Sequence, residues 1–334
     1  MKKIINDPIN FVREYVEGIC LAHSDQLQML NNDFRTLIRK EKAGDKVAIV
    51  TAGGSGHLPV FLGYVGQGLL DGCAVGDVFA SPSASKMSDL IRYCDSGKGV
   101  LCLYGNYGGD KMNFSLACDE AEIDGIETRQ VLIKDDIASA EFEKQEIRRG
   151  VAGMVYAFKI AGAKADTGAS LDEVVQTTEK ALKNIKTMGV ALSPCIVPTV
   201  GKPTFSIEDN KMEIGMGIHG EAGIEVSTML SADEIAEMLF NRINQELNLQ
   251  KGAKVSVMVN GLGATPLEEL YIVYRKLAHL LESKSVSIIM PHIGEFATSM
   301  EMSGLSVTLM LLDSELEQLL LTTAKSPFYT NFNK

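Results

Sequence analysis

The 334-residue sequence lacks features that would tie it to membranes or nucleic acid. No apolar run reaches the roughly 18–20 residues that a membrane span needs, and the first residues contain no signal-peptide hydrophobic region. We therefore expect a cytoplasmic protein without membrane contact. A formal net charge of −11 argues against a direct grip on nucleic acid, because binding phosphates needs a basic surface. Any action on DNA would go through a basic partner.

The usual cofactor motifs are also missing. The six cysteines are scattered and form no C-x-x-C pair, which favours reduced thiols over a disulfide framework or a zinc site. There is no Walker A string, no H-E-x-x-H and no G-x-S-x-G. The stretch Gly54-Ser-Gly56-His-Leu-Pro59 has proline where the dinucleotide fingerprint needs its third glycine. The sequence therefore predicts neither a metal nor a cofactor.

One glycine-rich loop stands out near the start of the chain. A β-branched run predicts a strand over 46–52, which is followed by Gly53-Gly-Ser-Gly-His57. Pro59 then opens a pattern of helical period that extends to residue 70. A strand that ends in such a loop and continues as a helix presents free N–H groups to an anion or an oxygen-rich ligand. His57 would add a titratable group at the same place.

Two further strings carry polar groups at the ends of predicted strands. The apolar run 99–104 predicts a buried strand, and its following loop ends at Asp110 before a predicted helix over 111–124. Asp110 is either a ligand group at the sheet edge or a helix N-cap. In 213–221, a period of two places Gly215, Gly217 and His219 on one face of a strand. That face is either a furrow leading a ligand to the imidazole or a packing surface.

The order of predicted elements indicates an α/β fold with two domains and mainly parallel or mixed sheets flanked by helices. The first domain spans 1–192, the second 193–323, and a loosely held tail 324–334. The proline-rich stretch 193–203 marks the crossing between the domains. Asp135-Asp136 is interpreted as a solvated turn, and His292 as a loop residue. Further predicted helices cover 8–41, 151–165, 170–187, 231–247 and 313–323, and further strands cover 128–134, 254–260, 284–290 and 305–312.

Seven strings, in register from residue 1 to about 323, resemble the dihydroxyacetone kinase K-subunit family: Gly53–His57, Gly63–Gly68, Gly76–Pro82, Asn106–Phe114, Arg148–Gly153, Lys159–Gly162 and Gly215–Glu221. The resemblance implies a homodimer of two-domain α/β protomers that binds dihydroxyacetone. It implies that a ring nitrogen of His219 adds to the ketone and forms a covalent hemiaminal. His57 and Asp110 would contact the hydroxyls and assist proton removal. The ligand-binding set would be completed by Gly53, Gly54, Ser55, Gly56 and Gly105.

The departures from the family pattern bear on activity. Leu58 stands where family kinases usually have glutamate, Val60-Phe61 replaces Ala-His, and Gly105 replaces a lysine that helps to hold the substrate. The retained residues are those that ketone capture needs, whereas the lost ones are polar and are expected to border the pocket. A lost lysine should cost transition-state stabilisation more than capture.

This pattern resembles the co-activator paralogues of the family, the DhaQ type. It implies a non-enzymatic dihydroxyacetone sensor that works with a TetR-type transcription regulator. The alternative is the substrate-binding K subunit of a phosphotransferase-dependent kinase for dihydroxyacetone or a related ketose, with a separate L-type subunit as phosphoryl donor.

Overall fold

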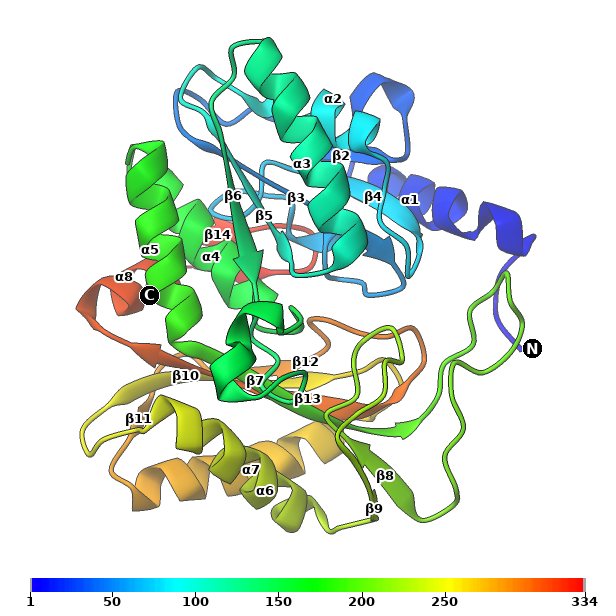
Figure 1. Ribbon diagram of the computed structural model, residues 1–334, viewed down its shortest axis with the longest axis vertical. Helices are drawn as coiled ribbons and strands as arrows, with labels where there is room; N and C mark the ends of the chain where they lie inside the picture. Colours follow the sequence, from blue (N-terminus) through cyan, green and yellow to red (C-terminus); the bar gives the residue numbers. More distant parts are fainter. Residues whose placement is uncertain (1, 333–334) are drawn as a thin grey trace.

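The computed structural model describes residues 2–332 and confirms an α/β fold with two sheets (Figure 1). The first sheet has the order β1-β2-β4-β3-β5-β6. Its strands are β1 (Leu27–Met29), β2 (Thr36–Arg39), β3 (Ala48–Ser55), β4 (Gly72–Val78), β5 (Val100–Gly105) and β6 (Thr128–Ile133). Strands β3 to β6 run parallel, and β2 is antiparallel to both β1 and β4. The parallel arrangement fits the predicted alternation of strands and helices.

The second sheet has the order β11-β10-β13-β7-β8-β9, with β12 also on β10. Its strands are β7 (Ile185–Ser193), β8 (Lys211–Ile214), β9 (Glu225–Thr228), β10 (Lys254–Gly261), β11 (Ser287–Ile288), β12 (His292–Gly294) and β13 (Ser303–Leu312). Strands β11 and β12 are parallel to β10, whereas the pairings along β10-β13-β7-β8-β9 are antiparallel. In chain order the first strand of this sheet is β7, which begins at Ile185, inside the stretch predicted as helix 170–187.

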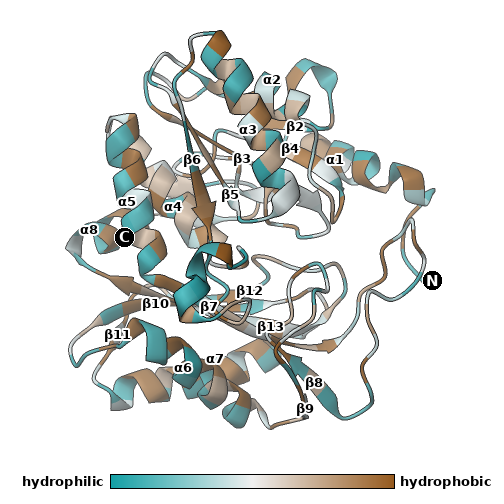
Figure 2. Ribbon diagram, in the orientation of Figure 1, coloured by the Kyte–Doolittle hydropathy of each residue, from teal (hydrophilic) through white to brown (hydrophobic). Residues whose placement is uncertain are grey.

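Helices cover both sheets in layers. Helices α2 (Ala84–Cys94) and α3 (Gly108–Ile123) pack on one face of the first sheet, and α4 (Met154–Ala165) and α5 (Leu171–Lys183) lie on the other. Helices α6 (Ala232–Leu247) and α7 (Leu267–Ser283) cover the outer face of the second sheet, and α8 (Ser314–Leu321) contacts α4. Hydropathy alternates along α6 and α7, as expected for helices with one buried face (Figure 2). Within residues 2–332, no helix combines the length and apolarity needed to span a membrane.

The predicted helix over 8–41 is correct only in its first half. The 3-10 turn η1 (Pro8–Asn10) leads into α1 (Phe11–Ala22), and the chain then forms β1, η2 (Leu30–Asn32) and β2. Asn31 and Asn32 have φ angles of 54° and 59°, which an α-helix cannot contain. Leu27 and Leu37 are buried as strand residues instead. Their spacing is compatible with a helix, but tertiary packing selects the strand.

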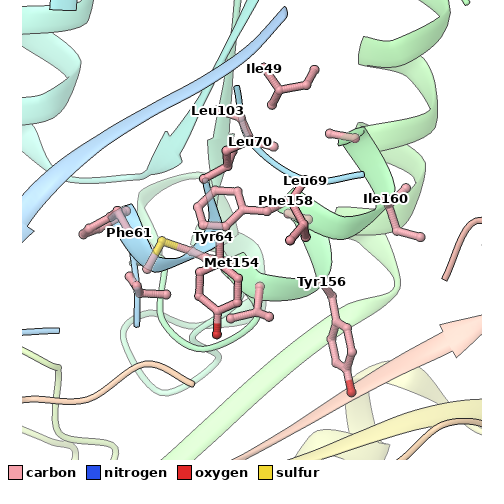
Figure 3. Close-up of a cluster of buried hydrophobic side chains, with 14 of the residues drawn as sticks. Ile49, Phe61, Tyr64, Leu69, Leu70, Leu103, Met154, Tyr156, Phe158 and Ile160 are labelled. Atoms are coloured by element: carbon pink, nitrogen blue, oxygen red, sulfur yellow. The ribbon is translucent and has the colours of Figure 1, made fainter. Parts of the chain in front are cut away.

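Helix α4 is buried along nearly its whole length, and Figure 3 shows side chains of Met154, Tyr156, Phe158 and Ile160 in an apolar cluster. Phe158 packs against Tyr64, and Met154 and Ile160 belong to the same apolar cluster. Gly162 permits this packing, because a side chain there would meet the backbone of Leu69, with a Cβ only 2.5 Å from the Leu69 nitrogen. Close approach of two main chains therefore explains this glycine.

Gly162→Ala should destabilise the fold by about 3 kcal/mol, because the added methyl group meets main-chain atoms that cannot move aside. Gly18→Ala is the matched control. Gly18 also lies inside a helix, but a Cβ added there would have no atom within 4 Å. That change should raise helix propensity and stabilise the protein by about 0.5–1 kcal/mol. Urea unfolding of both variants gives the two free energies, and equal effects would contradict the packing explanation.

The segment after the glycine loop does not form the predicted helix. Residues 58–70 form turns and one short 3-10 helix, η3 (Leu62–Tyr64). Close packing explains its glycines, because residues of the C-terminal tail occupy the space beside Gly66 and Gly68. A side chain at Gly66 would meet Ser326 at 2.8 Å. The glycines therefore accommodate the tail and do not belong to a ligand-binding helix.

The tail itself is held in place, contrary to the prediction. Strands β14 (Ala324–Lys325) and β15 (Thr330–Asn331) pair with each other, and Tyr329 is 6% exposed. The Tyr329 hydroxyl lies 3.1 Å from Nε2 of His292, whose Nδ1 lies 3.2 Å from the Tyr156 hydroxyl. His292 is therefore a buried residue of β12, and burial lowers its pKa to about 4. This Tyr-His-Tyr arrangement joins the tail to the second sheet and to α4.

Candidate functional site

The candidate site lies where the carboxyl ends of three parallel strands meet a loop of the second sheet. Gly54 lies near the end of β3, Phe79 and Asp110 lie in the segments that follow β4 and β5, and the segment after β8 supplies His219. Open α/β sheets place ligands at this edge. An open cavity of about 360 Å³ lies here, lined by Gly54, Phe79, Ala80, Ser81, Tyr107, Gly108, Gly109, Asp110, His219 and Glu221. Two of the three residues predicted to act on a ligand, Asp110 and His219, are therefore brought together.

The third predicted residue, His57, lies directly behind this lining. Its ring stacks on Phe79 at 5.0 Å and meets the His219 ring edge-on at 4.7 Å. Nδ1 of His57 donates to the carbonyl of Thr298 at 2.8 Å, which leaves the Nε2 lone pair without a partner. The side chain is fully buried, and this burial, together with the neighbouring His219, lowers the pKa of His57 to about 3. His57 is therefore a neutral imidazole with one free acceptor nitrogen.

Asp110 lies in the first turn of α3, and its Oδ1 is buried without a hydrogen-bond donor. Burial raises the pKa of Asp110 to about 6, against the lowering effects of Ser81 and His219. No N-cap bond is made by Asp110, because α3 already begins at Gly108. The strand, loop and helix arrangement expected at the first glycine loop is thus found at the second, where Gly108 and Gly109 bring the α3 N-terminus to the cavity.

Asp110→Asn should stabilise the folded protein by about 2 kcal/mol at pH 7.5. Since the folded-state pKa exceeds the usual value of 3.8, the folded state binds this proton more tightly than the unfolded chain. The buried Asp110 carboxylate therefore destabilises the wild-type protein. This destabilisation is fully present above about pH 6 and is lost as the pH falls from 6 towards 3.8. Urea unfolding at pH 7.5 and 4.5 should show the gain only at the higher pH. Asp119→Asn, at an exposed position of the same helix, should change neither value.

His219 is oriented by Glu221, two residues further along the loop. Nδ1 of His219 donates to Oε1 of Glu221 at 2.9 Å, and the His219 backbone N–H donates to Oε2 at 3.0 Å. Burial would raise the pKa of Glu221, but the His219 imidazole and the Arg149 guanidinium lower it to about 2. The carboxylate thus stays charged and keeps the proton on Nδ1, so Nε2 carries the lone pair. His219 therefore presents its Nε2 at a partly open position, with 21% of its side chain exposed.

The predicted strand face of Gly215, Gly217 and His219 does not exist as a furrow. Strand β8 ends at Ile214, and Gly215 has a φ of +78°, which breaks the period of two. The space beside Gly217 is filled by the Glu221 carboxylate and by Nη1 of Arg149, which would lie 2.5 Å from a Cβ added there. Gly217 therefore makes room for the side chains that orient His219, whereas a side chain at Gly215 would meet Ala138, and neither glycine receives a ligand.

Most of the predicted loop residues lie outside the cavity. A side chain at Gly53 would meet the ring of Phe61, and the Ser55 hydroxyl donates to the Gly76 carbonyl at 2.7 Å. Gly56 borders a separate groove beside α1, leaving Gly54 as the loop residue in the lining. Gly105 lies one layer behind, where an added Cβ would be 3.0 Å from the Tyr107 ring.

The substituted positions lie away from the cavity too. Leu58 lines the groove beside α1, together with Phe11, Tyr15 and Met300. Phe61 is buried and packs over Gly53. The expectation that these positions border the ligand pocket is therefore wrong for Leu58 and Phe61. Neither substitution changes a residue of the described cavity lining.

Sequence reasoning missed several residues at the site. Glu221 and Tyr107 stand inside the strings that resemble the family but were assigned no role, although the His-x-Glu spacing could have indicated a histidine held by a carboxylate. Phe79 has a φ of +59°, which is rare for an aromatic residue and brings its ring against both histidines. Arg149 comes from another part of the chain and donates a hydrogen bond to the loop that carries His219, and no local signal predicts this contact.

The chemistry of the lining favours addition to a carbonyl. It offers the Nε2 of His219 as a nucleophile and a carboxyl oxygen of Asp110 without a hydrogen-bond donor, and the unprotonated nitrogen of His57 lies behind the lining. A ketone that carries hydroxyl groups would use all of these groups. None of the described lining residues is a lysine or an arginine.

Comparisons with known proteins identify the family of this chain. The Dak1 domain family matches residues 17–328. The dihydroxyacetone-binding subunit DhaK of PTS-dependent dihydroxyacetone kinase 2 from Listeria innocua is 42% identical over 330 residues, covering 98% of this chain and 99% of the relative. The L-erythrulose kinase of Pectobacterium atrosepticum is 39% identical, and the match covers 98% of this chain but 56% of that longer protein.

The solved structure of a co-activator is also similar to this chain. The dihydroxyacetone kinase operon co-activator Dha-DhaQ superposes with a TM-score of 0.89 at 34% identity, covering 95% of this chain and 98% of that one. A kinase subunit in sequence and a co-activator in structure thus each match this chain over nearly their full lengths. The chain belongs to the Dak1 domain family, together with the DhaK-type dihydroxyacetone-binding subunits.

Proposed function

We propose that this protein captures dihydroxyacetone, or a closely related hydroxyketone, on His219 and acts as a ligand-sensing co-activator. In the capture step the Nε2 lone pair forms a bond to the ketone carbon, and the C=O π pair moves to the oxygen. The Nδ1 proton passes to Glu221, 2.9 Å away, which releases it to solvent, and the new alkoxide takes one proton from solvent in return. The product is a neutral hemiaminal, and no further reactant is consumed.

Ligand hydroxyls would donate hydrogen bonds to the two buried atoms of the site that lack a partner. Oδ1 of Asp110 and Nε2 of His57 both need a hydrogen bond, and both can accept one from a hydroxyl. A polyol such as glycerol offers the same hydroxyls but has no electrophilic carbon. The imidazole therefore supplies selectivity for ketones, and the acceptors supply selectivity for hydroxylated ones.

The charge of the cavity is the observation that supports a sensor over an enzyme. Its described lining contains the carboxyl groups of Asp110 and Glu221 but no lysine or arginine, and Gly105 stands where family kinases have a lysine. Phosphoryl transfer needs cations that stabilise charge developing on the transferred group. Capture of a neutral ketone needs none. We propose a TetR-type regulator as the partner, since an acidic homodimer would leave the DNA contacts to a basic protein.

A second candidate is the K subunit of a kinase, supported by the 42% identity to a DhaK subunit. One experiment separates the two. Dihydroxyacetone labelled with ¹³C at the carbonyl is added to the protein, and NMR follows loss of the ketone signal; a phosphoryl-charged L-type subunit is then added. We expect an adduct without triose phosphate. Family-like turnover would contradict the co-activator role, and an unchanged ketone signal would contradict capture.

A further inference from the structure

Behind His219 lies a chain of charged groups that crosses from one sheet to the other. Asp136 follows β6 of the first sheet, and Arg149 follows the 3-10 helix η4 (Phe142–Ile147). The Arg149 guanidinium donates to Oδ2 of Asp136 from Nη2 at 2.8 Å and from Nε at 3.1 Å. It also donates to the Gly215 carbonyl at 3.1 Å, and Nη1 lies 3.8 Å from Oε2 of Glu221. The interpretation of Asp135-Asp136 as a solvated turn is therefore wrong.

Asp136, which anchors this series of charged groups, is held firmly in place. Asp136 is 3% exposed, and its backbone forms a bridge to Thr187 in β7 of the second sheet. Its Oδ1 accepts the backbone N–H of Ala138 at 3.1 Å. Asp135 beside it accepts the N–H groups of Val151 and Gly153, so the whole turn is fixed. Arg149 can therefore move little, and the Gly215–Glu221 loop is bonded to a fixed cation.

We propose that Arg149 is a positioning residue that is shared between two carboxylates, Asp136 and Glu221, and that it keeps Glu221 aligned and the His219 imidazole unprotonated and ready to attack. This role deepens the proposed capture function and rests on it for its purpose. The balance follows from the geometry, because one guanidinium is shared between Asp136 and Glu221. Removing the cation leaves Glu221, which bonds the imidazole, and Asp136 behind it without their shared positive charge, which favours the protonated form of His219. Removing Asp136 leaves the cation wholly to Glu221, which favours the neutral form.

Other charged and titratable groups also face His219, and they stay constant in the test. His57 comes from the loop after β3, and Tyr107 and Asp110 come from the start of α3. The adjacent Arg148 pairs bidentately with Glu246 of α6 at 2.7 Å and does not bond Glu221. It is the matched control for disturbing a buried arginine in this segment.

The test is an NMR titration of the histidine rings in the ligand-free full chain, with His219 assigned by the His219→Ala variant. Arg149→Met should move the His219 protonation midpoint up by about 0.5–1 pH unit. Asp136→Asn should move it down by a smaller amount, since burial already raises the pKa of Asp136 to about 6. Arg149→Lys should stay near wild type because it keeps the charge, and Arg148→Lys should not move the midpoint.

Arg149→Met and Asp136→Asn break the same ion pair, so loosened packing would move the His219 midpoint in the same direction in both variants. Opposite shifts therefore cannot arise from loosened packing. If Arg149→Met fails to fold, Asp136→Asn decides the matter by itself: a downward shift supports the proposal, and no shift or an upward shift overturns it. Because the midpoint is read without ligand, a failure here is distinguishable from a failure of ketone capture in the wild type. Capture by Arg149→Met should fall several-fold at pH 6 and little at pH 8.5.

Discussion

Replacing His219 with alanine should abolish covalent capture of dihydroxyacetone and leave the fold intact. His219 is the only residue of the described cavity lining with a basic ring nitrogen, and Glu221 fixes the tautomer that exposes its lone pair. The side chain is 21% exposed and fills no part of the apolar core, so its loss costs little stability. The ¹³C ketone signal should persist at all ligand concentrations. Apparent affinity should fall by roughly 100-fold, equivalent to about 2.7 kcal/mol.

The variant should also lose its preference for ketones. In the wild type, dihydroxyacetone should bind far better than glycerol, because only the ketone can form the bond to Nε2. In His219→Ala both ligands would bind weakly through the same hydroxyl acceptors, and the ratio of their affinities should approach one. His279→Ala, at an exposed position of α7, is the histidine control. An adduct that survives in His219→Ala would place the nucleophile on another residue.

The fold could be predicted well wherever local signals and packing agree. The helix expected over 231–247 is observed as α6 (Ala232–Leu247), because a capping box of Ser231 and Glu234 fixes its start and its apolar stripe faces the sheet. The prediction failed at 23–41 and at 58–70. There the decisive partners, β4 beside β2 and the C-terminal tail beside Gly66, lie far away in the sequence. Local periodicity contains no information about them.

The candidate site was predictable in its types of residue but not in its arrangement. His219 and Asp110 lie at one cavity as expected, and strand ends at a parallel sheet edge explain why. The glycines were misjudged, since a glycine that admits a ligand and one that admits a neighbouring side chain look alike in a sequence. Gly217 is of the second kind, because Glu221 and Arg149 fill the space beside it. The Arg149 contact depends on how two sheets pack, which no motif encodes.

Glu221→Gln should reduce the rate of capture by about 10⁴-fold, although it replaces only one oxygen of the side chain. The carboxylate accepts two hydrogen bonds, from the His219 backbone N–H at 3.0 Å and from Nδ1 at 2.9 Å. A glutamine offers one oxygen and one NH₂ group. The backbone N–H is always a donor and claims the oxygen, so the NH₂ group faces Nδ1. The imidazole then adopts the other tautomer, and its proton moves to Nε2, where the nucleophile should be. An enzyme histidine held in the wrong tautomer loses a factor of this size.

Tautomer control by Glu221 can be separated from the effect of its charge. Glu221→Gln keeps the size of the side chain and its bond to the backbone, so the loop should stay in place and stability should change little. Glu221→Ala removes the carboxylate but leaves the imidazole free to choose its tautomer. It should therefore retain more capture than Glu221→Gln, even though it deletes more atoms. Stopped-flow capture rates at pH 7.5 test this order, and ¹⁵N shifts of the His219 ring report the tautomer directly. If Glu221→Gln captured faster than Glu221→Ala, the carboxylate would act through its charge and not by placing the Nδ1 proton.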